Sequence, residues 1–218
     1  MSNLKVKVCG ITRPENMLQI ASLRPDFMGF IFYPQSKRDV SKRIHELPLE
    51  AIPPSIKKVA VLVNQPLEEA EKILSTFHFD LVQLHGSESP DYCRQLRQKA
   101  TVIKSFGVGE NLPPNIGEYN PYCDYFLFDT LGKQAGGNGV PFDHQLLQNY
   151  NEQKPYLLAG GISPETDLHR LSEQVQQPVD NPMLFALDIN SRFETEPGIK
   201  DPALIEMFLN KVRQMNLH

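Results

Sequence analysis

Eight short apolar runs recur along the chain, and most are followed by a segment with the pattern of a helix. The runs are VKVCG, FMGFIF, KKVAVLV, LVQLHG, TVIKSF, YFLFDT, PYLLAGG and MLFALDI. Several are almost continuous in Phe, Ile, Leu and Val, which is typical of strands buried on both faces of a parallel sheet. Eight β-α units in 218 residues fit a closed (β/α)8 TIM barrel better than an open, doubly wound sheet, which is the alternative.

Helix-start signals follow several of these runs. The stretches SESPDY, GISPET and KDPALIE each place a capping residue (Ser89, Ser163 and Asp201) directly before a proline. Proline is favoured at the first helical position because its missing N–H would be unpaired there. The proline-rich stretches PPSIKK and NLPPNIGEYNPY make the second and fifth helices the weakest of the predicted units.

Length, charge and cysteine content restrict the class of protein. A length of 218 residues with 40% hydrophobic side chains fits one domain spanning 1–218. The net charge of −4 argues against nucleic acid as a partner, and no apolar stretch approaches the ~18 residues that cross a membrane. Three cysteines without CxxC spacing form neither a disulfide framework nor a zinc site. With no signal-peptide pattern, these features predict a cytoplasmic protein.

Chemically active side chains stand where the apolar runs end, which in a barrel is the edge that carries the active site. Cys9 ends the first run, Asp129 the sixth and Asp188 the eighth. His85 ends the fourth, where a structural role is the more usual one. A thiol and a carboxyl group at two strand ends can meet across the mouth of a barrel, which is an arrangement suited to acid–base chemistry.

Two glycine-rich segments point to a ligand. Gly160 and Gly161 follow the seventh run, and barrels often bind phosphate through the backbone N–H groups of the loops after their last two strands. The stretch TLGKQAGGNG after Asp129 is polar and glycine-rich. It is either a lid that closes over a ligand or a surface loop without a role in ligand binding.

Taken together, the motifs resemble one enzyme family. KVCGIT, SKR, VQLHG, LFDT followed by GGNG and FD, LAGGISPE and DINSRFETEPGIKD occur in an order that resembles phosphoribosylanthranilate isomerase of tryptophan biosynthesis, from Leu4 to about Leu209. The resemblance implies a (β/α)8 barrel that needs no cofactor and no metal. It also implies an Amadori rearrangement of N-(5-phosphoribosyl)anthranilate to 1-(2-carboxyphenylamino)-1-deoxyribulose 5-phosphate, with this phosphosugar-anthranilate as the small-molecule partner of a monomer or homodimer.

The resemblance also implies roles for individual residues. Cys9 matches the family's general base, Asp129 its general acid, and Arg38 the arginine that holds the anthranilate carboxylate. Gly160 and Gly161, with the loop after the eighth strand, match the backbone that binds the phosphate.

That last loop departs from the family pattern, and the role of its neighbour Asp188 is open. Ser191 is followed by Arg192 where the family commonly has glycine. We expect Arg192 to pair with the phosphate or to face solvent. Asp188 is either a contact to a substrate hydroxyl or a carboxylate that organises the loop.

The implied chemistry sets conditions on two pKa values. Asp129 can protonate the furanose oxygen only if its pKa is raised by burial or neighbours. An unperturbed thiol has a pKa near ~8.5, so a modest downward shift would supply a useful thiolate at Cys9. The competing functions are another phosphosugar barrel, either a pentose-phosphate epimerase or indole-glycerol-phosphate synthase, and a catalytically silent barrel that binds a ligand or partner.

Overall fold

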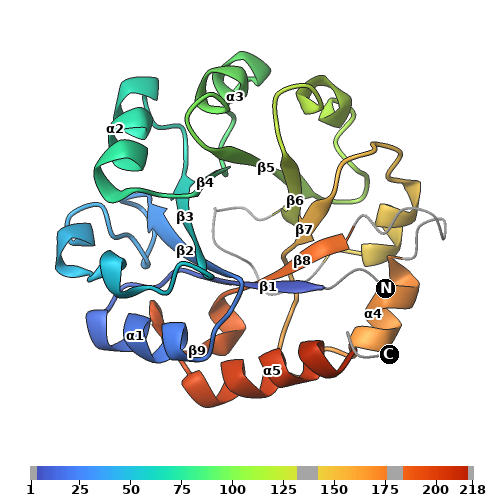
Figure 1. The fold of residues 1–218 in the computed structure, drawn as a ribbon. Helices are drawn as coiled ribbons and strands as arrows, with labels where there is room; N and C mark the ends of the chain where they lie inside the picture. Colours follow the sequence, from blue (N-terminus) through green and yellow to red (C-terminus); the bar gives the residue numbers. More distant parts are fainter. Residues whose placement is uncertain (1–3, 132–141, 176–183, 216–218) are drawn as a thin grey trace.

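The computed structural model, which describes residues 4–131, 142–175 and 184–215, contains a closed barrel of parallel strands (Figure 1). Each strand pairs with the next in sequence, and β8 pairs back onto β1. The strands are β1 (Lys5–Cys9), β2 (Phe27–Phe32), β3 (Lys57–Leu62), β4 (Leu81–Leu84), β5 (Thr101–Val108), β6 (Tyr125–Thr130), β7 (Tyr156–Leu158) and β8 (Leu184–Ile189). The predicted barrel is confirmed, and the open sheet is excluded because β1 and β8 pair.

Helices surround the barrel. The α-helices are α1 (Pro14–Ser22), α2 (Leu67–Phe77), α3 (Pro90–Leu96), α4 (Leu168–Gln174) and α5 (Pro202–Met215). The 3₁₀ helices are η1 (Ile44–Glu46), η2 (Leu49–Ala51), η3 (Ile116–Tyr119), η4 (His144–Asn149) and η5 (Ser191–Phe193), and a hairpin of β9 (Glu194–Glu196) and β10 (Ile199–Lys200) lies between β8 and α5. None of the described helices is both long and apolar enough to cross a membrane.

Two of the three predicted helix starts are confirmed. The Ser89 hydroxyl accepts the Tyr92 N–H at 3.2 Å, and the Asp201 carboxylate accepts the Ala203 N–H at 2.9 Å. The third prediction is wrong: α4 begins at Leu168 and is capped by Asp167. After β7, Ser163 instead takes part in a turn in which its N–H donates to the Thr166 hydroxyl at 2.8 Å, so the local bonds of the turn replace those of a helix.

The weak units predicted from proline are also confirmed. The connection from β2 to β3, described throughout, contains η1 and η2 in place of an α-helix. The connection from β5 to β6, also described throughout, contains only η3. Proline removes backbone donors and clashes with the preceding turn, so short 3₁₀ turns are what these segments can form.

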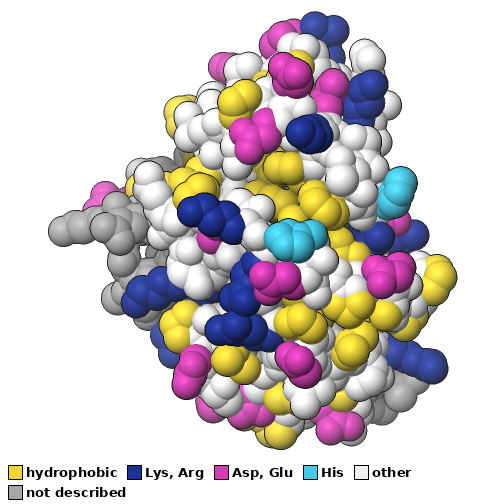
Figure 2. Space-filling view, turned by 90° about the vertical axis from the view of Figure 1, so that its left-hand side faces the viewer, with side chains coloured by type: hydrophobic (Ala, Val, Ile, Leu, Met, Phe, Trp, Pro, Cys, Tyr) yellow, Lys and Arg dark blue, Asp and Glu magenta, His cyan; other side chains and the backbone are white. Residues whose placement is uncertain are grey.

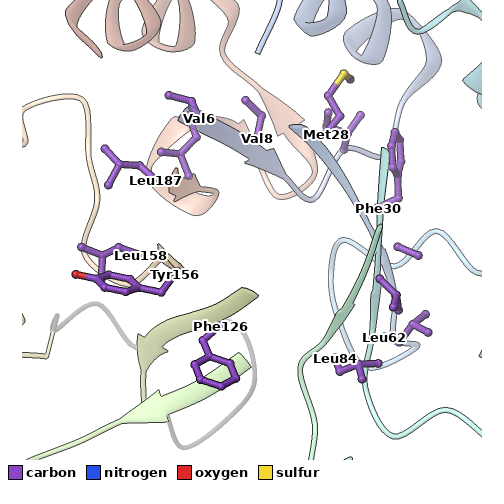
Figure 3. Packing of buried hydrophobic residues seen from close by; sticks show 14 of the residues in the cluster. Val6, Val8, Met28, Phe30, Leu62, Leu84, Phe126, Tyr156, Leu158 and Leu187 are labelled. Atoms are coloured by element: carbon purple, nitrogen blue, oxygen red, sulfur yellow. The ribbon is translucent and has the colours of Figure 1, made fainter. Parts of the chain in front are cut away.

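The core has two layers because side chains alternate across each strand. The outer layer packs the barrel against its helices, and Figure 3 shows part of it, with Val6, Val8, Met28, Phe30 and Leu62 among the labelled side chains. The inner layer fills the barrel interior. Its buried members are Cys9, Phe27, Val59, Val61, Leu81, Ile103, Leu127, Leu157, Ala159 and Ala186.

Charged side chains of both signs are mixed on the face of the molecule seen in Figure 2, and hydrophobic side chains gather toward its middle. This mixture agrees with the small net charge of −4.

Candidate active site

Strand alternation turns three reactive side chains toward the same space. Cys9 ends β1 and belongs to the inner layer of the barrel. Asp129 and Asp188 each lie two residues beyond an inner-layer residue, Leu127 on β6 and Ala186 on β8, and therefore face inward as well. All three sit toward the carboxyl ends of their strands, so the structure brings the predicted thiol and both predicted carboxylates to one mouth of the barrel.

A buried ion pair lies directly beneath this mouth. Lys7 and Asp188 occupy paired positions of β1 and β8, and Lys7 Nζ lies 2.9 Å from Asp188 Oδ2. The Lys7 side chain is 0% exposed. Burial acts to lower the pKa of Lys7, but the carboxylate of Asp188 and the sulfur of Cys9 outweigh it and leave the pKa raised. Lys7 is therefore a fixed positive charge next to the candidate base.

Lys7 was not among the residues predicted from the sequence, although a signal for it was present. A lysine two residues before Cys9 in a parallel strand must point into the barrel on the same side as the thiol. Such a charge is retained inside a protein only when it is paired.

The Cys9 thiol is buried, and its neighbours act on it in opposite directions. Burial raises the pKa of Cys9, while the positive charges of Lys7 and Lys200 act to lower it. The net shift of the Cys9 pKa is upward, so the structure does not show the modest downward shift predicted for a thiolate. Glycine at position 29, paired with Cys9 on β2, makes the space: a Cβ there would lie 2.9 Å from the sulfur.

The Asp129 carboxyl group meets the condition for a general acid. Burial raises its pKa to about 6, although the Thr130 N–H, which donates to Oδ1 at 2.8 Å, acts to lower it. His85 Nε2 lies 3.6 Å from Asp129 Oδ2. Burial, with Lys7 and Lys104 nearby, lowers the pKa of His85 to about 4, so the ring is neutral at pH 7 and adds no charge that would hold the carboxylate ionised.

The raised pKa of Asp129 predicts that this residue destabilises the fold at neutral pH. Its folded pKa of about 6 exceeds the ordinary 3.8, so ionisation is penalised above pH 6 and the penalty vanishes below the unfolded pKa. Asp129→Asn should raise the free energy of unfolding by about 2–3 kcal/mol at pH 7.5. Urea unfolding should show that the gain in the free energy of unfolding shrinks by more than half at about pH 4.5. A gain that does not depend on pH would contradict the raised pKa of Asp129.

Arg38, the predicted carboxylate-binding residue, lies beside Cys9 and is already paired. Its stem packs on Gly10, where an added Cβ would lie 2.7 Å from Arg38 Cδ and where φ is +80°. Its Nε and Nη2 groups donate to the carboxylate of Glu194 at 2.8 and 2.6 Å. Lys200 Nζ also lies 2.7 Å from Glu194. Glu194 and Lys200 were not among the residues predicted from sequence, because only the return of the β9–β10 hairpin to Arg38 reveals them.

Of the two predicted phosphate loops, the one after β7 contains Gly160 and Gly161. Gly160 and Gly161 have φ of +74° and +84°, a conformation that favours glycine. No acceptor among the described residues contacts the N–H of either glycine. Position 160 also has no room for a side chain, since a Cβ there would lie 2.4 Å from the Thr130 hydroxyl.

Ser191 and Arg192, in the loop after β8, are exposed. The charge of Arg192 acts on Glu165, so this loop lies close to the segment that follows Gly160 and Gly161. Most of the predicted lid, TLGKQAGGNG, falls at 132–139, which lies outside the described residues. Among the residues that are described, no three His, Cys, Asp or Glu side chains gather as ligands for a metal ion.

Comparisons with known proteins agree with this geometry. The family model for N-(5'phosphoribosyl)anthranilate (PRA) isomerase matches residues 6–211. An N-(5'-phosphoribosyl)anthranilate isomerase of Phocaeicola vulgatus is 38% identical over 211 residues, which cover 96% of this chain and 98% of that protein.

Solved structures show the same relationship. Phosphoribosyl anthranilate isomerase from Thermotoga maritima superposes with a TM-score of 0.78 at 31% identity, covering 97% of this chain and 99% of the other. A phosphoribosyl anthranilate isomerase in complex with reduced 1-(o-carboxyphenylamino)-1-deoxyribulose 5-phosphate superposes with a TM-score of 0.74 at 30% identity, covering 97% and 99%.

Proposed function

The chain belongs to the phosphoribosylanthranilate isomerase family, and we propose that it catalyses the Amadori rearrangement of N-(5-phosphoribosyl)anthranilate in tryptophan biosynthesis. One observation carries the proposal: a thiol and a carboxyl group with a pKa of about 6 face the same mouth of the barrel from β1 and β6. An aldose–ketose isomerisation requires one group that donates a proton and one that removes a proton from carbon.

Asp129 is the proposed acid. It donates its proton to the furanose oxygen as the bond between that oxygen and C1 breaks, which opens the ring and leaves a protonated imine between C1 and the anthranilate nitrogen. A pKa of about 6 leaves a useful fraction of Asp129 protonated near neutrality. The buried site strengthens the interaction between the carboxyl group and the charge that develops on the substrate.

Cys9 is the proposed base. The positively charged imine acidifies the hydrogen on C2, and the Cys9 thiolate removes it, so that the electron pair of the C–H bond moves to form an enolamine. Tautomerisation of the enolamine, in which the C2 hydroxyl loses its proton and C1 gains one, gives the ketone. Lys7 and Lys200 favour the thiolate electrostatically and offset part of the effect of burial, although the pKa of Cys9 remains raised.

The remaining roles place the substrate across the mouth of the barrel. Arg38 would bind the anthranilate carboxylate, since a guanidinium and a carboxylate form two parallel hydrogen bonds. Gly160, Gly161, Ser191 and Arg192 would hold the phosphate. Asp188 would accept a sugar hydroxyl through Oδ1, which is buried and has no hydrogen-bond partner among the described residues.

The proposal extends to how the protein exists in the cell. We propose one domain over 1–218, present as a monomer or homodimer in the cytoplasm, with no cofactor. Dimeric phosphoribosylanthranilate isomerase is known from Thermotoga maritima, and a structure of monomers generated from that dimer is similar to this chain, with a TM-score of 0.73 at 29% identity.

The test of the activity is direct. Freshly made phosphoribosylanthranilate is fluorescent, and the purified protein should abolish that fluorescence at a rate proportional to its concentration. Loss no faster than spontaneous hydrolysis of the substrate would refute the proposed function.

Arg38→Ala tests how the substrate is recognised. Removing the guanidinium should raise KM and weaken productive binding by about 1.5–3 kcal/mol, the usual contribution of a hydrogen bond to a charged group. The same kinetics are then measured with the aniline analogue, which lacks the carboxylate. Equal penalties for the two substrates would contradict the assignment, because a carboxylate contact can be lost only by the substrate that carries one.

A further inference from the structure

Glu194, which the mechanism above does not use, is the most strongly fixed carboxylate near Arg38. Its two oxygens accept from Arg38 Nε at 2.8 Å and from Nη2 at 2.6 Å, and its side chain is 4% exposed. Paired, parallel hydrogen bonds of this kind give an ion pair both strength and a defined orientation. Glu194 therefore determines the plane in which the guanidinium lies.

Glu194 is itself held from its other sides. Lys200 Nζ lies 2.7 Å from Oε1, and the Gly198 N–H donates to the same oxygen at 3.0 Å. Lys200 is fully buried and also donates to Asn190 Oδ1 at 2.7 Å. The cluster of Arg38, Glu194 and Lys200 thus contains two cations and one anion, which leaves one positive charge to balance an incoming anion.

The pairing with Glu194 leaves one hydrogen-bonding edge of the Arg38 guanidinium open. A guanidinium has two edges that can bind a carboxylate through two hydrogen bonds, and Glu194 occupies the edge formed by Nε and Nη2. No acceptor among the described residues contacts Nη1, so the second edge, formed by Nη1 and Nη2, keeps its donors. The stem of Arg38 also packs against Gly10, the residue after Cys9, and the charge of Cys9 acts on the guanidinium, so Arg38 lies near the candidate base.

We propose that Glu194 is a positioning residue that holds Arg38 so that its Nη1–Nη2 edge receives the aryl carboxylate of the substrate, and that this arrangement sets the preference for carboxylate-bearing substrates. The proposal rests on the proposed function and names a further residue of the same site. Without Glu194 the arginine would sample many rotamers, and ordering it on binding would weaken recognition.

In an alternative role, Glu194 competes with the substrate for Arg38, and its removal would then have the opposite effect on substrate affinity. If the substrate carboxylate had to displace Glu194, removing Glu194 would strengthen binding of the carboxylated substrate. Positioning predicts weaker binding of that substrate and no comparable change for a substrate without the carboxylate. The two roles therefore predict opposite changes in the ratio of kcat/KM for the carboxylated substrate to kcat/KM for the substrate without the carboxylate.

The experiment compares Glu194→Gln with wild type on two substrates, phosphoribosylanthranilate and the glycosylamine that ribose 5-phosphate forms with aniline. Gln keeps the size of Glu but has one acceptor oxygen, so it cannot form the two parallel hydrogen bonds to Nε and Nη2. We expect the preference for the carboxylated substrate, as the ratio of kcat/KM values, to fall about tenfold, mainly through KM. Glu196→Gln, an exposed carboxylate on the same strand, is the matched control and should leave the ratio unchanged.

A second measurement separates positioning from a general structural effect. In an Arg38→Ala background, Glu194→Gln should not lower the ratio further, because the residue it positions is gone. An unchanged or increased ratio in the single variant, or an equal fall in both backgrounds, would overturn the proposal. Wild-type turnover is measured in the same assay, so absence of activity refutes the proposed function, whereas normal activity with an unaltered ratio refutes only the role of Glu194.

Discussion

Cys9→Ser and Asp129→Asn should each slow turnover by about 10²–10⁴-fold, the range usually contributed by a general acid or base. Serine places a hydroxyl where the sulfur stood, and an alcohol is far too weakly acidic to supply an anion near neutral pH. Asparagine can still accept the Thr130 N–H that Asp129 accepts at 2.8 Å, but it has no proton to give to the ring oxygen. Both changes are close in size to the native side chain, so the barrel should fold.

The measurement is kcat under saturating substrate, with far-UV circular dichroism and product affinity as controls for folding and binding. Product affinity should stay within about threefold of wild type, because neither proton transfer occurs in the bound product. Losses below about tenfold for both variants would refute the assignment of acid and base. Asp129→Asn should also be the more stable protein, so activity and stability change in opposite directions at one residue.

Lys7→Met should destabilise the protein by about 3–5 kcal/mol, the cost of leaving one partner of a buried ion pair uncompensated. Lys7 Nζ lies 2.9 Å from Asp188 Oδ2, and the Lys7 side chain is 0% exposed, so the variant removes a buried partner of the Asp188 carboxylate. Methionine matches the stem of lysine in shape, and the loss therefore reports the charge and its hydrogen bond. The measurement is urea unfolding at pH 7.5 followed by circular dichroism.

Two matched variants give this prediction its controls. Lys57→Met removes a comparable contact at the surface, where Nζ lies 3.2 Å from Asp80 and the lysine is 51% exposed, and it should change stability by less than about 1 kcal/mol. Lys7→Met combined with Asp188→Leu removes both charges and should recover much of the loss. If Lys7→Met were no more destabilising than Lys57→Met, the buried pair would not stabilise the fold.

The sequence by itself determined the architecture and the chemical class of the site. Eight buried-strand patterns indicate a parallel sheet, and eight units in this length fit a closed barrel better than an open sheet, which the pairing of β1 with β8 then excluded. Once the barrel is accepted, Cys9 and Asp129 must share a mouth, since the carboxyl ends of parallel strands lie together. These features follow from the local periodicity of apolar residues and from the order of the strands, both of which can be read from the sequence.

Only the tertiary structure decided what surrounds those residues. The start of α4 at Leu168 depended on a turn between Ser163 and Thr166 that competes with helix capping. The upward pKa shifts of Cys9 and Asp129 arise from burial by residues distant in sequence. The pairing of Arg38 with Glu194, 156 positions away, depends on where the β9–β10 hairpin returns to the barrel. Burial and long-range charge pairs depend on distances in space, which strand and helix periodicity do not encode.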